Sequence, residues 1–192
     1  MRTVSALVFV LLLPAVASAQ SRAFAVWERP AAGVFIGPSV NGDRNSGDAG
    51  LDVGFVFDTP VVFGHRLRAD ASRVTWRFEE RDYPGALKAS DLVTLKSIRL
   101  SVLNVRHAGA RAAGYAGGGY GAYRYEYAQL PLHNPWRGGF HAVAGLETIS
   151  QSQRFAVDAE VRLHAINGTR QPPVFSVALF KLDAAIGMKM RF

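Results

Sequence analysis

The residues from Phe180 to Phe192 constrain the fold of this chain more than any other stretch. Apolar side chains alternate there with charged or small ones up to the last residue, so that Phe180, Leu182, Ala184, Ile186, Met188, Met190 and Phe192 stand against Lys181, Asp183, Ala185, Gly187, Lys189 and Arg191. A period of two residues is typical of a β-strand with one apolar and one polar face. A strand that is apolar along one whole face and ends on an aromatic residue predicts the closing strand of a membrane barrel.

The first twenty residues have the features of a secretory signal peptide. Arg2 supplies a positive charge, an apolar run follows from Val4 to Val16, and Ala17-Ser18-Ala19 forms a cleavage site of small residues. The run is shorter than the about 20 residues that a membrane-spanning helix needs. We therefore predict a signal peptide over residues 1–19, an irregular periplasmic lead-in over 20–30 and a barrel over 31–192.

Composition limits how the exported chain is held together. It contains no cysteine, so neither a disulfide nor the lipid anchor of a lipoprotein is available to it. No second apolar run reaches the length of a membrane helix, which leaves the strands of a closed barrel as the means of crossing a bilayer. The chain that remains after the signal, about 170 residues, accommodates eight strands with their loops. Losing Arg2 lowers the formal charge from +7 to +6, a balance that favours anionic lipid over nucleic acid as the partner.

Turn-forming residues divide the rest of the chain into segments of alternating pattern. We predict strands at 31–41, 49–58, 64–78, 92–106, 112–126, 139–150, 153–165 and 175–192. In the third segment the apolar phase shifts between Ala71 and Val74, which predicts a β-bulge near Ser72 or Arg73. In the fourth, Lys96 falls on the apolar face, and we expect it near the lipid headgroups, where its ammonium group can reach water.

The connections alternate between longer polar segments and tight turns. The longer ones are 42–48, 79–91, 127–138 and 166–173, and the tight ones are 59–63, 107–111 and 150–152. An even number of strands puts both chain ends on the periplasmic side, so the longer connections face outward. Aromatic residues gather at both predicted rims, as in interfacial girdles. They are Trp76, Phe78, Tyr123, Tyr125, Tyr127, Trp136 and Phe140 beside the longer connections, and Phe57, Phe63 and Phe192 at the opposite rim.

On these features the chain resembles the small eight-stranded outer-membrane barrels, the group of the OmpA transmembrane domain, OmpX and OmpW. The resemblance rests on the signal, the alternating segments and the strand that ends at Phe192. It implies an all-β, antiparallel up-and-down transmembrane barrel in the outer membrane of a Gram-negative-type envelope. It also implies that Met188, Met190 and Phe192 form an assembly signal for the barrel-assembly machinery. Outer-membrane lipids and lipopolysaccharide are the expected partners, and neither nucleic acid nor a cofactor is expected.

The polar face of such a barrel lines its interior. We predict a lumen charge network of Asp52, Arg68, Asp70, Arg99, Arg124, Glu126, Glu147, Asp158, Glu160, Arg162, Lys181 and Asp183, with His141, His164, Lys189 and Arg191 also facing inward. An eight-stranded barrel is just wide enough for side chains to fill it. The charges are therefore predicted to form a plug of salt bridges rather than to line a channel.

The glycine-rich stretch Gly117-Gly118-Gly119-Tyr120-Gly121 superficially fits a dinucleotide-binding motif. That motif requires a following helix whose amino terminus meets the phosphates, whereas the next residues alternate as a strand. The glycines are instead predicted to allow a close approach of neighbouring strands. The five histidines show no metal-ligand spacing.

We predict a non-enzymatic protein with a structural or surface-interaction role. Its surface-loop candidates are Tyr83, Leu130, Trp136 and Arg137. Two alternatives stay open, an outer-membrane lipid-modifying hydrolase and a soluble periplasmic lipocalin-like barrel that binds a ligand in an apolar interior. His164 invites comparison with outer-membrane lipid A deacylases, in which a serine follows the histidine by two positions. That position is Ile166 here, which cannot act as a nucleophile.

Overall fold

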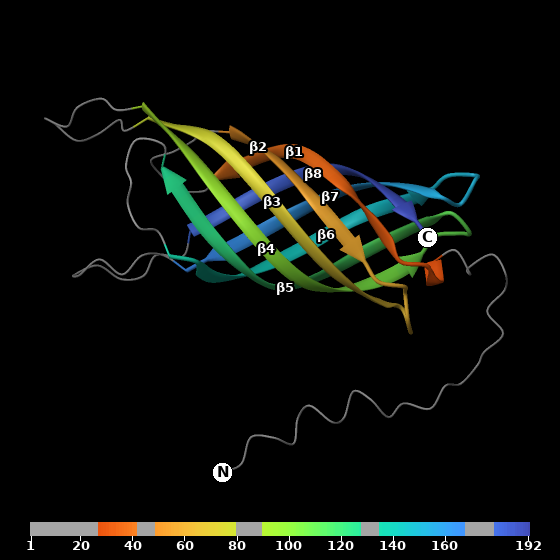
Figure 1. The fold of residues 1–192 in the computed structure, drawn as a ribbon. Helices are drawn as coiled ribbons and strands as arrows, with labels where there is room; N and C mark the ends of the chain where they lie inside the picture. Colours follow the sequence, from red (N-terminus) through yellow and green to blue (C-terminus); the bar gives the residue numbers. More distant parts are fainter. Residues whose placement is uncertain (1–26, 42–48, 80–89, 128–134, 168–178) are drawn as a thin grey trace, which may run out of the picture.

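The chain forms a closed barrel of eight antiparallel strands in sequence order, with β8 paired to β1 (Figure 1). The structure is a computed structural model that describes residues 27–41, 49–79, 90–127, 135–167 and 179–192. The strands are β1 Ala31–Asn41, β2 Ala49–Asp58, β3 His65–Glu79, β4 Ser90–His107, β5 Ala112–Tyr127, β6 Arg137–Ile149, β7 Phe155–Ile166 and β8 Leu179–Arg191. The predicted all-β, up-and-down barrel is confirmed. Within the described residues, no helix has the length and apolar character needed to span a membrane.

The two ends of the barrel differ. At one end, on the right of Figure 1, β1 begins and β8 finishes, and tight turns join β2 to β3, β4 to β5 and β6 to β7. We call this the turn end and the opposite one the loop end. The β2–β3 turn is a two-residue hairpin, in which Phe63 and Gly64 have φ angles of 51° and 77°. Reciprocal backbone hydrogen bonds between Val62 and His65, 2.8 and 2.9 Å long, close it.

The pairing of β3 with its neighbours is continuous. The register runs from Leu51 opposite Thr75 to Asp58 opposite Arg68 on one side, and without a break along β4 on the other. The predicted bulge near Ser72 or Arg73 is therefore wrong. The apolar phase shifts because the interior itself changes character. Toward the loop end, an apolar cluster fills the lumen, made of Val74, Trp76, Val93, Leu95, Tyr123, Tyr125 and Ile166.

The glycines of β5 allow β4 and β5 to approach closely. A Cβ atom on Gly119 would overlap the carbonyl oxygen of Leu100, and one on Gly117 would overlap that of Val102. No other residue type fits at these positions without moving the β4 backbone. The residues that follow continue β5 as a strand, so the arrangement lacks the helix that a dinucleotide-binding motif requires.

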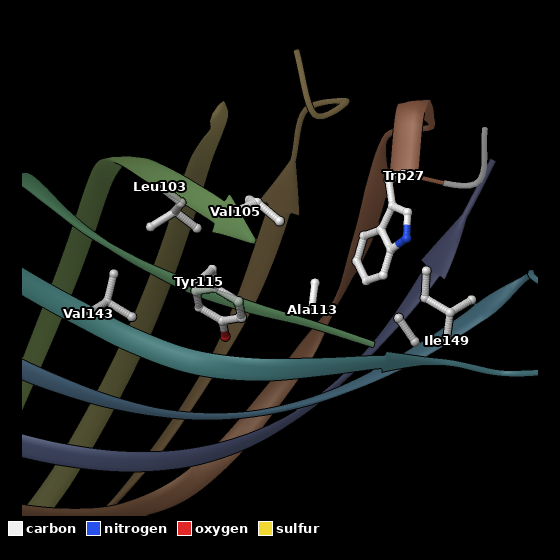
Figure 2. Packing of buried hydrophobic residues seen from close by; sticks show 8 residues of the cluster. Trp27, Leu103, Val105, Ala113, Tyr115, Val143 and Ile149 are labelled. Carbon is white, nitrogen blue, oxygen red and sulfur yellow. The ribbon is translucent and has the colours of Figure 1, made fainter. Parts of the chain in front are cut away.

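Trp27 closes the turn end of the lumen. It lies in a short 3₁₀ turn before β1, and its side chain is buried. Figure 2 shows its indole ring pointing into the barrel beside Ala113 and Ile149. The full cluster is Trp27, Leu103, Val105, Ala113, Tyr115, Val143, Ile149 and Ala156. The predicted lead-in thus contributes a cap that the sequence pattern had not identified.

Candidate functional site

The outer wall of the barrel is apolar and its interior is charged. Phe180, Val157 and Ile186 are 52%, 49% and 64% exposed, whereas Glu160 and Lys189 are 5% and 0% exposed. A soluble barrel requires the opposite arrangement, because exposed apolar area is unfavourable in water and unpaired buried charge is costly. The lipocalin-like alternative is therefore wrong, and the outer wall is suited to hydrocarbon.

The buried charges balance. Among the residues that the structure describes, seven acidic ones are buried, namely Asp52, Asp58, Asp70, Glu147, Asp158, Glu160 and Asp183. Seven basic residues are buried with them, namely Arg66, Arg68, Arg99, Arg162, Lys181, Lys189 and Arg191. The formal excess of +7 in the whole chain therefore comes from residues outside this set.

Two carboxylates organise the turn end of the lumen. Asp58 accepts hydrogen bonds from Arg66 at 3.2 Å, from Nε of Arg68 at 2.7 Å and from Nζ of Lys189 at 2.9 Å. Glu147 accepts from Arg66 at 2.7 Å, from Lys189 at 2.8 Å and from Arg191. Because Arg66 and Lys189 each contact both carboxylates, these residues form one network rather than separate pairs.

Other ion pairs cross the full width of the lumen. β3 and β7 are four strands apart in a ring of eight and thus lie opposite each other. Arg68 on β3 nevertheless reaches Glu160 on β7 at 2.5 Å, and Arg162 on β7 lies 3.6 Å from Asp70 on β3. Tyr115 on β5 donates its hydroxyl to the same Glu160 at 2.7 Å. Side chains from facing walls therefore meet at the centre of the barrel.

A second group lies nearer the loop end, around Asp183. Its Oδ2 atom is 2.8 Å from Nε2 of His164 and 2.8 Å from Nζ of Lys181, which is also 3.6 Å from Asp52. On the other side of the imidazole ring, Nδ1 of His164 lies 3.0 Å from the hydroxyl of Tyr123. Both ring nitrogens of His164 are therefore held by lumen side chains.

Ser101 and His141 form the contact that most resembles catalytic geometry. The Ser101 hydroxyl lies 2.7 Å from Nε2 of His141. A hydroxyl beside a histidine base is the arrangement of a nucleophilic site. Both residues are buried inside the lumen, however, and Ile166, two positions after His164, is buried in the apolar cluster. This arrangement does not present a nucleophile to lipid, which meets the barrel at its outer wall.

The structure places ten of the twelve predicted network residues inside the lumen and the other two outside it. The ten are Asp52, Arg68, Asp70, Arg99, Glu147, Asp158, Glu160, Arg162, Lys181 and Asp183. Arg124 and Glu126 lie on the outer face of β5, with side chains 43% and 36% exposed. Their predicted lumen position is wrong because Tyr123 and Tyr125 occupy the inward positions, where their rings fill the loop-end cluster.

The predicted aromatic girdle at the loop end is correspondingly thinner. Trp76, Tyr123 and Tyr125 face inward, so their assignment to the girdle is wrong, whereas Phe140 and Trp136 are 66% and 46% exposed. At the turn end the three predicted aromatic residues are all exposed. Their exposed fractions are 44% for Phe57, 67% for Phe63 and 60% for Phe192.

The remaining predicted residues fall in different settings. Tyr83 and Leu130 lie outside the described residues. Arg137 stands at the loop-end mouth, with its guanidinium carbon 5.8 Å from the centre of the Tyr125 ring. Met188 and Met190 point outward on β8, 57% and 53% exposed. The described residues contain no cluster of acidic or histidine side chains able to hold a metal ion.

Several contributors to the lumen were absent from the predicted set, among them Asp58, Arg66 and Trp27. Asp58 and Arg66 had a usable signal, because Asp58 shares its strand phase with Asp52 and Arg66 shares its phase with Arg68. Trp27 had none, since it precedes the first alternating segment. Its position depends on how the lead-in folds back, which no local pattern indicates.

Together the closed sheet, the apolar wall and the filled lumen define a β-barrel with the fold of the small eight-stranded outer-membrane proteins. Neisserial surface protein A has this fold with a TM-score of 0.65 and 13% identity, over 85% of this chain and 97% of that one. The outer membrane protein OprG from Pseudomonas aeruginosa gives 0.60 and 13%, over 86% and 96%. Ail, the attachment invasion locus protein of Yersinia pestis, gives 0.51 and 11%, over 85% and 99%.

These likenesses confirm the barrel class that the alternating segments predicted. At 11–13% identity they establish the fold alone. No protein-family model matches the sequence, and a comparison with curated proteins finds no match. The role of the chain therefore has to be argued from its own lumen and surface.

Proposed function

We propose that this chain is an integral protein of the bacterial outer membrane, in which the barrel is a closed, non-enzymatic anchor that holds the loop-end segments at the cell surface. The apolar outer wall supports a membrane location, because it is stable only against hydrocarbon. Loops on a rigid scaffold commonly carry recognition.

The single observation that supports a closed lumen is the contact between side chains from facing walls of the barrel. The Arg68–Glu160 pair crosses from β3 to β7, and Lys189 on β8 bonds to Asp58 on β2 and to Glu147 on β6. Trp27 adds a cap beneath this network at the turn end. An ion moving through the barrel would have to break several buried ion pairs, each of which is costly to leave unpaired.

Planar lipid bilayers test the closed state. The folded mature chain is added to the bilayer, and a general porin at the same protein concentration serves as the positive control. We expect no steady conductance from this chain while the porin produces regular steps. Unitary steps that increase in number with the amount of folded chain would show an open channel and overturn the closed state.

Fractionation tests the location independently of conductance. Envelope fractions are separated on a density gradient, and samples run unboiled and boiled on a denaturing gel reveal the folded barrel by its change in mobility. We expect a heat-modifiable band in the outer-membrane fraction. Recovery of the chain in the soluble periplasmic fraction without detergent would refute an integral barrel.

We also propose that Met188, Met190 and Phe192 are recognised by the barrel-assembly machinery. All three side chains point outward at the turn end of β8, where they make few contacts inside the finished barrel. Residues that contribute little to the folded interior yet complete an unbroken apolar stripe are suited to recognition before insertion.

A further inference from the structure

The outer face of β3, β4 and β5 changes from apolar to basic along a single line. Arg73 is the register partner of Lys96, and Lys96 is the register partner of Arg124. We call these three residues the basic row. The next outward positions toward the turn end are Ala71, Ile98 and Ala122, which are again in register with one another. The row therefore marks a level at which the apolar wall of these strands is interrupted, and an exposed apolar residue, Leu92 on β4, returns beyond it toward the loop end.

Among the residues whose side chains the structure describes, the basic row has only a partial counter-charge in contact with it. Glu126 lies 2.8 Å from Nζ of Lys96 and 3.7 Å from Nε of Arg124. Three cations and one carboxylate leave this group with a net formal charge of +2. Directly opposed residues on a sheet have Cβ atoms about 5 Å apart, and like charges at that spacing destabilise the pairing. A row of this kind is favourable when a further anion lies against it.

Within the described part of the strands, the row also occupies one sector of the barrel rather than a ring. On other strands, outward residues near the loop end are apolar and exposed: Val40 on β1, Leu51 on β2, Phe140 on β6 and Phe180 on β8. General contact with an anionic membrane surface would favour basic residues all round. A cluster on three adjacent strands favours one ligand at a defined place.

We propose that the basic row binds the phosphate groups of a phosphorylated glycolipid in the outer leaflet. Arg73 and Arg124 provide planar guanidinium groups that match phosphate oxygens in pairs, and Lys96 between them provides a point charge. Ala71, Ile98 and Ala122 lie beneath the row, where the acyl chains of the same lipid pack. This apolar floor favours a lipid over free phosphate. The inference rests on the outer-membrane location proposed above.

The test uses the full mature chain in detergent micelles, with bisphosphorylated lipid A as the probe. The row variant carries Arg73→Gln, Lys96→Gln and Arg124→Gln. The matched control carries Arg106→Gln, Arg111→Gln and Arg154→Gln, which removes the same charge from exposed positions at the turn end. We expect the row variant to bind lipid A about 100-fold more weakly than wild type. The control should remain within about threefold of wild type.

Two further probes separate the lipid from its headgroup alone. Dephosphorylated lipid A should bind wild type and row variant equally weakly, and millimolar inorganic phosphate should not displace bound lipid A. Equal affinity of the row variant and the control for lipid A would overturn the proposal, as would full displacement by inorganic phosphate.

Heat-modifiability of each variant on a gel keeps this test separate from the proposed location. If the row variant folds and binds lipid A as tightly as wild type, the proposed lipid site is refuted and the proposed barrel location is unaffected. If the wild-type chain is found in the soluble fraction, the proposed outer-membrane location is refuted, whatever its affinity for lipid A in micelles. In phosphate-free micelles the row variant should unfold at no lower temperature than wild type, because the repulsion within the row is removed.

Discussion

Lys189 on β8 donates a hydrogen bond from Nζ to Oδ2 of Asp58 on β2 at 2.9 Å, although 131 positions separate the two residues in the sequence. The strand between them in the ring is β1, so the contact forms only once β8 has paired with β1. It therefore belongs to the closed barrel alone. Arg66 and Arg68 contact the same carboxylate, so Asp58 is shared by three buried cations.

Asp58→Ala should lower the free energy of unfolding by about 3–5 kcal/mol, because it removes a carboxylate that three buried cations share and leaves them short of counter-charge. Urea unfolding in phospholipid vesicles measures this. Glu28→Ala is the control, since Glu28 is exposed at the turn end, and its effect should stay within about 0.5 kcal/mol. Equal effects of the two substitutions would contradict the network.

Ile186→Arg should destabilise the barrel by about 2–4 kcal/mol if the middle of β8 faces hydrocarbon. Ile186 lies near the centre of its strand and is 64% exposed. Val62→Arg places the same charge in the β2–β3 turn, where the cost should be about 0–1 kcal/mol. Urea unfolding in phospholipid vesicles compares the free energies of unfolding of the two variants. A small and equal effect would mean that the wall of β8 does not meet the bilayer core.

Gly119→Ala should destabilise by about 1–3 kcal/mol, because the new Cβ atom meets the β4 backbone at the Leu100 carbonyl. Gly114→Ala on the same strand is the matched substitution. Its Cβ atom would lie 3.7 Å from Cδ2 of Leu146, an ordinary contact, so the change should stay within about 0.5 kcal/mol. Thermal melting followed by circular dichroism distinguishes the two. Tolerance of both alanines would show that β5 does not need its glycines.

Phe192→Ala should reduce the amount of folded barrel in the outer membrane of living cells without slowing refolding in detergent. The reason is that Phe192 is 60% exposed and contributes little to the interior. Phe63→Ala removes a similarly exposed aromatic ring at the same end, 67% against 60%, and serves as control. Quantifying the heat-modifiable band from envelopes gives the result. A matching loss in the in vitro refolding yield would instead assign Phe192 a role in stability.

Alternation alone predicted most of the fold. The first two predicted strands coincide with β1 and β2, and the fourth and sixth begin two residues later than β4 and β6. These segments are readable because one face is uniformly apolar, so a shift of one residue would invert every side chain. The last predicted strand began at residue 175, and residues 175–178 lie outside those the structure describes.

The alternating pattern gave wrong predictions where aromatic residues face the lumen and charged residues face outward. On β5, tyrosines were assigned to the rim and Arg124 to the lumen, but Tyr123 and Tyr125 fill the interior. Tyrosine suits either environment, since its ring is apolar and its hydroxyl finds a partner, here His164 for Tyr123. Val74 and Trp76 also face the lumen, and because the sequence pattern placed apolar residues on the outer face, their phase was interpreted as a bulge. Deciding between the faces requires knowing what the opposite wall supplies, which is not local information.

The burial of Trp27 depends on closure of the barrel. Its indole ring lies 4.8 Å beneath the guanidinium carbon of Arg191 on β8, 5.9 Å from that of Arg66 on β3 and 5.0 Å from the ring of His107 on β4. These contacts come from β3, β4 and β8, so they form together only when the last strand has joined the sheet. Full burial of Trp27, the first described residue of the chain, therefore requires β8 to be in place, so the environment of one indole ring distinguishes the closed ring from an open sheet.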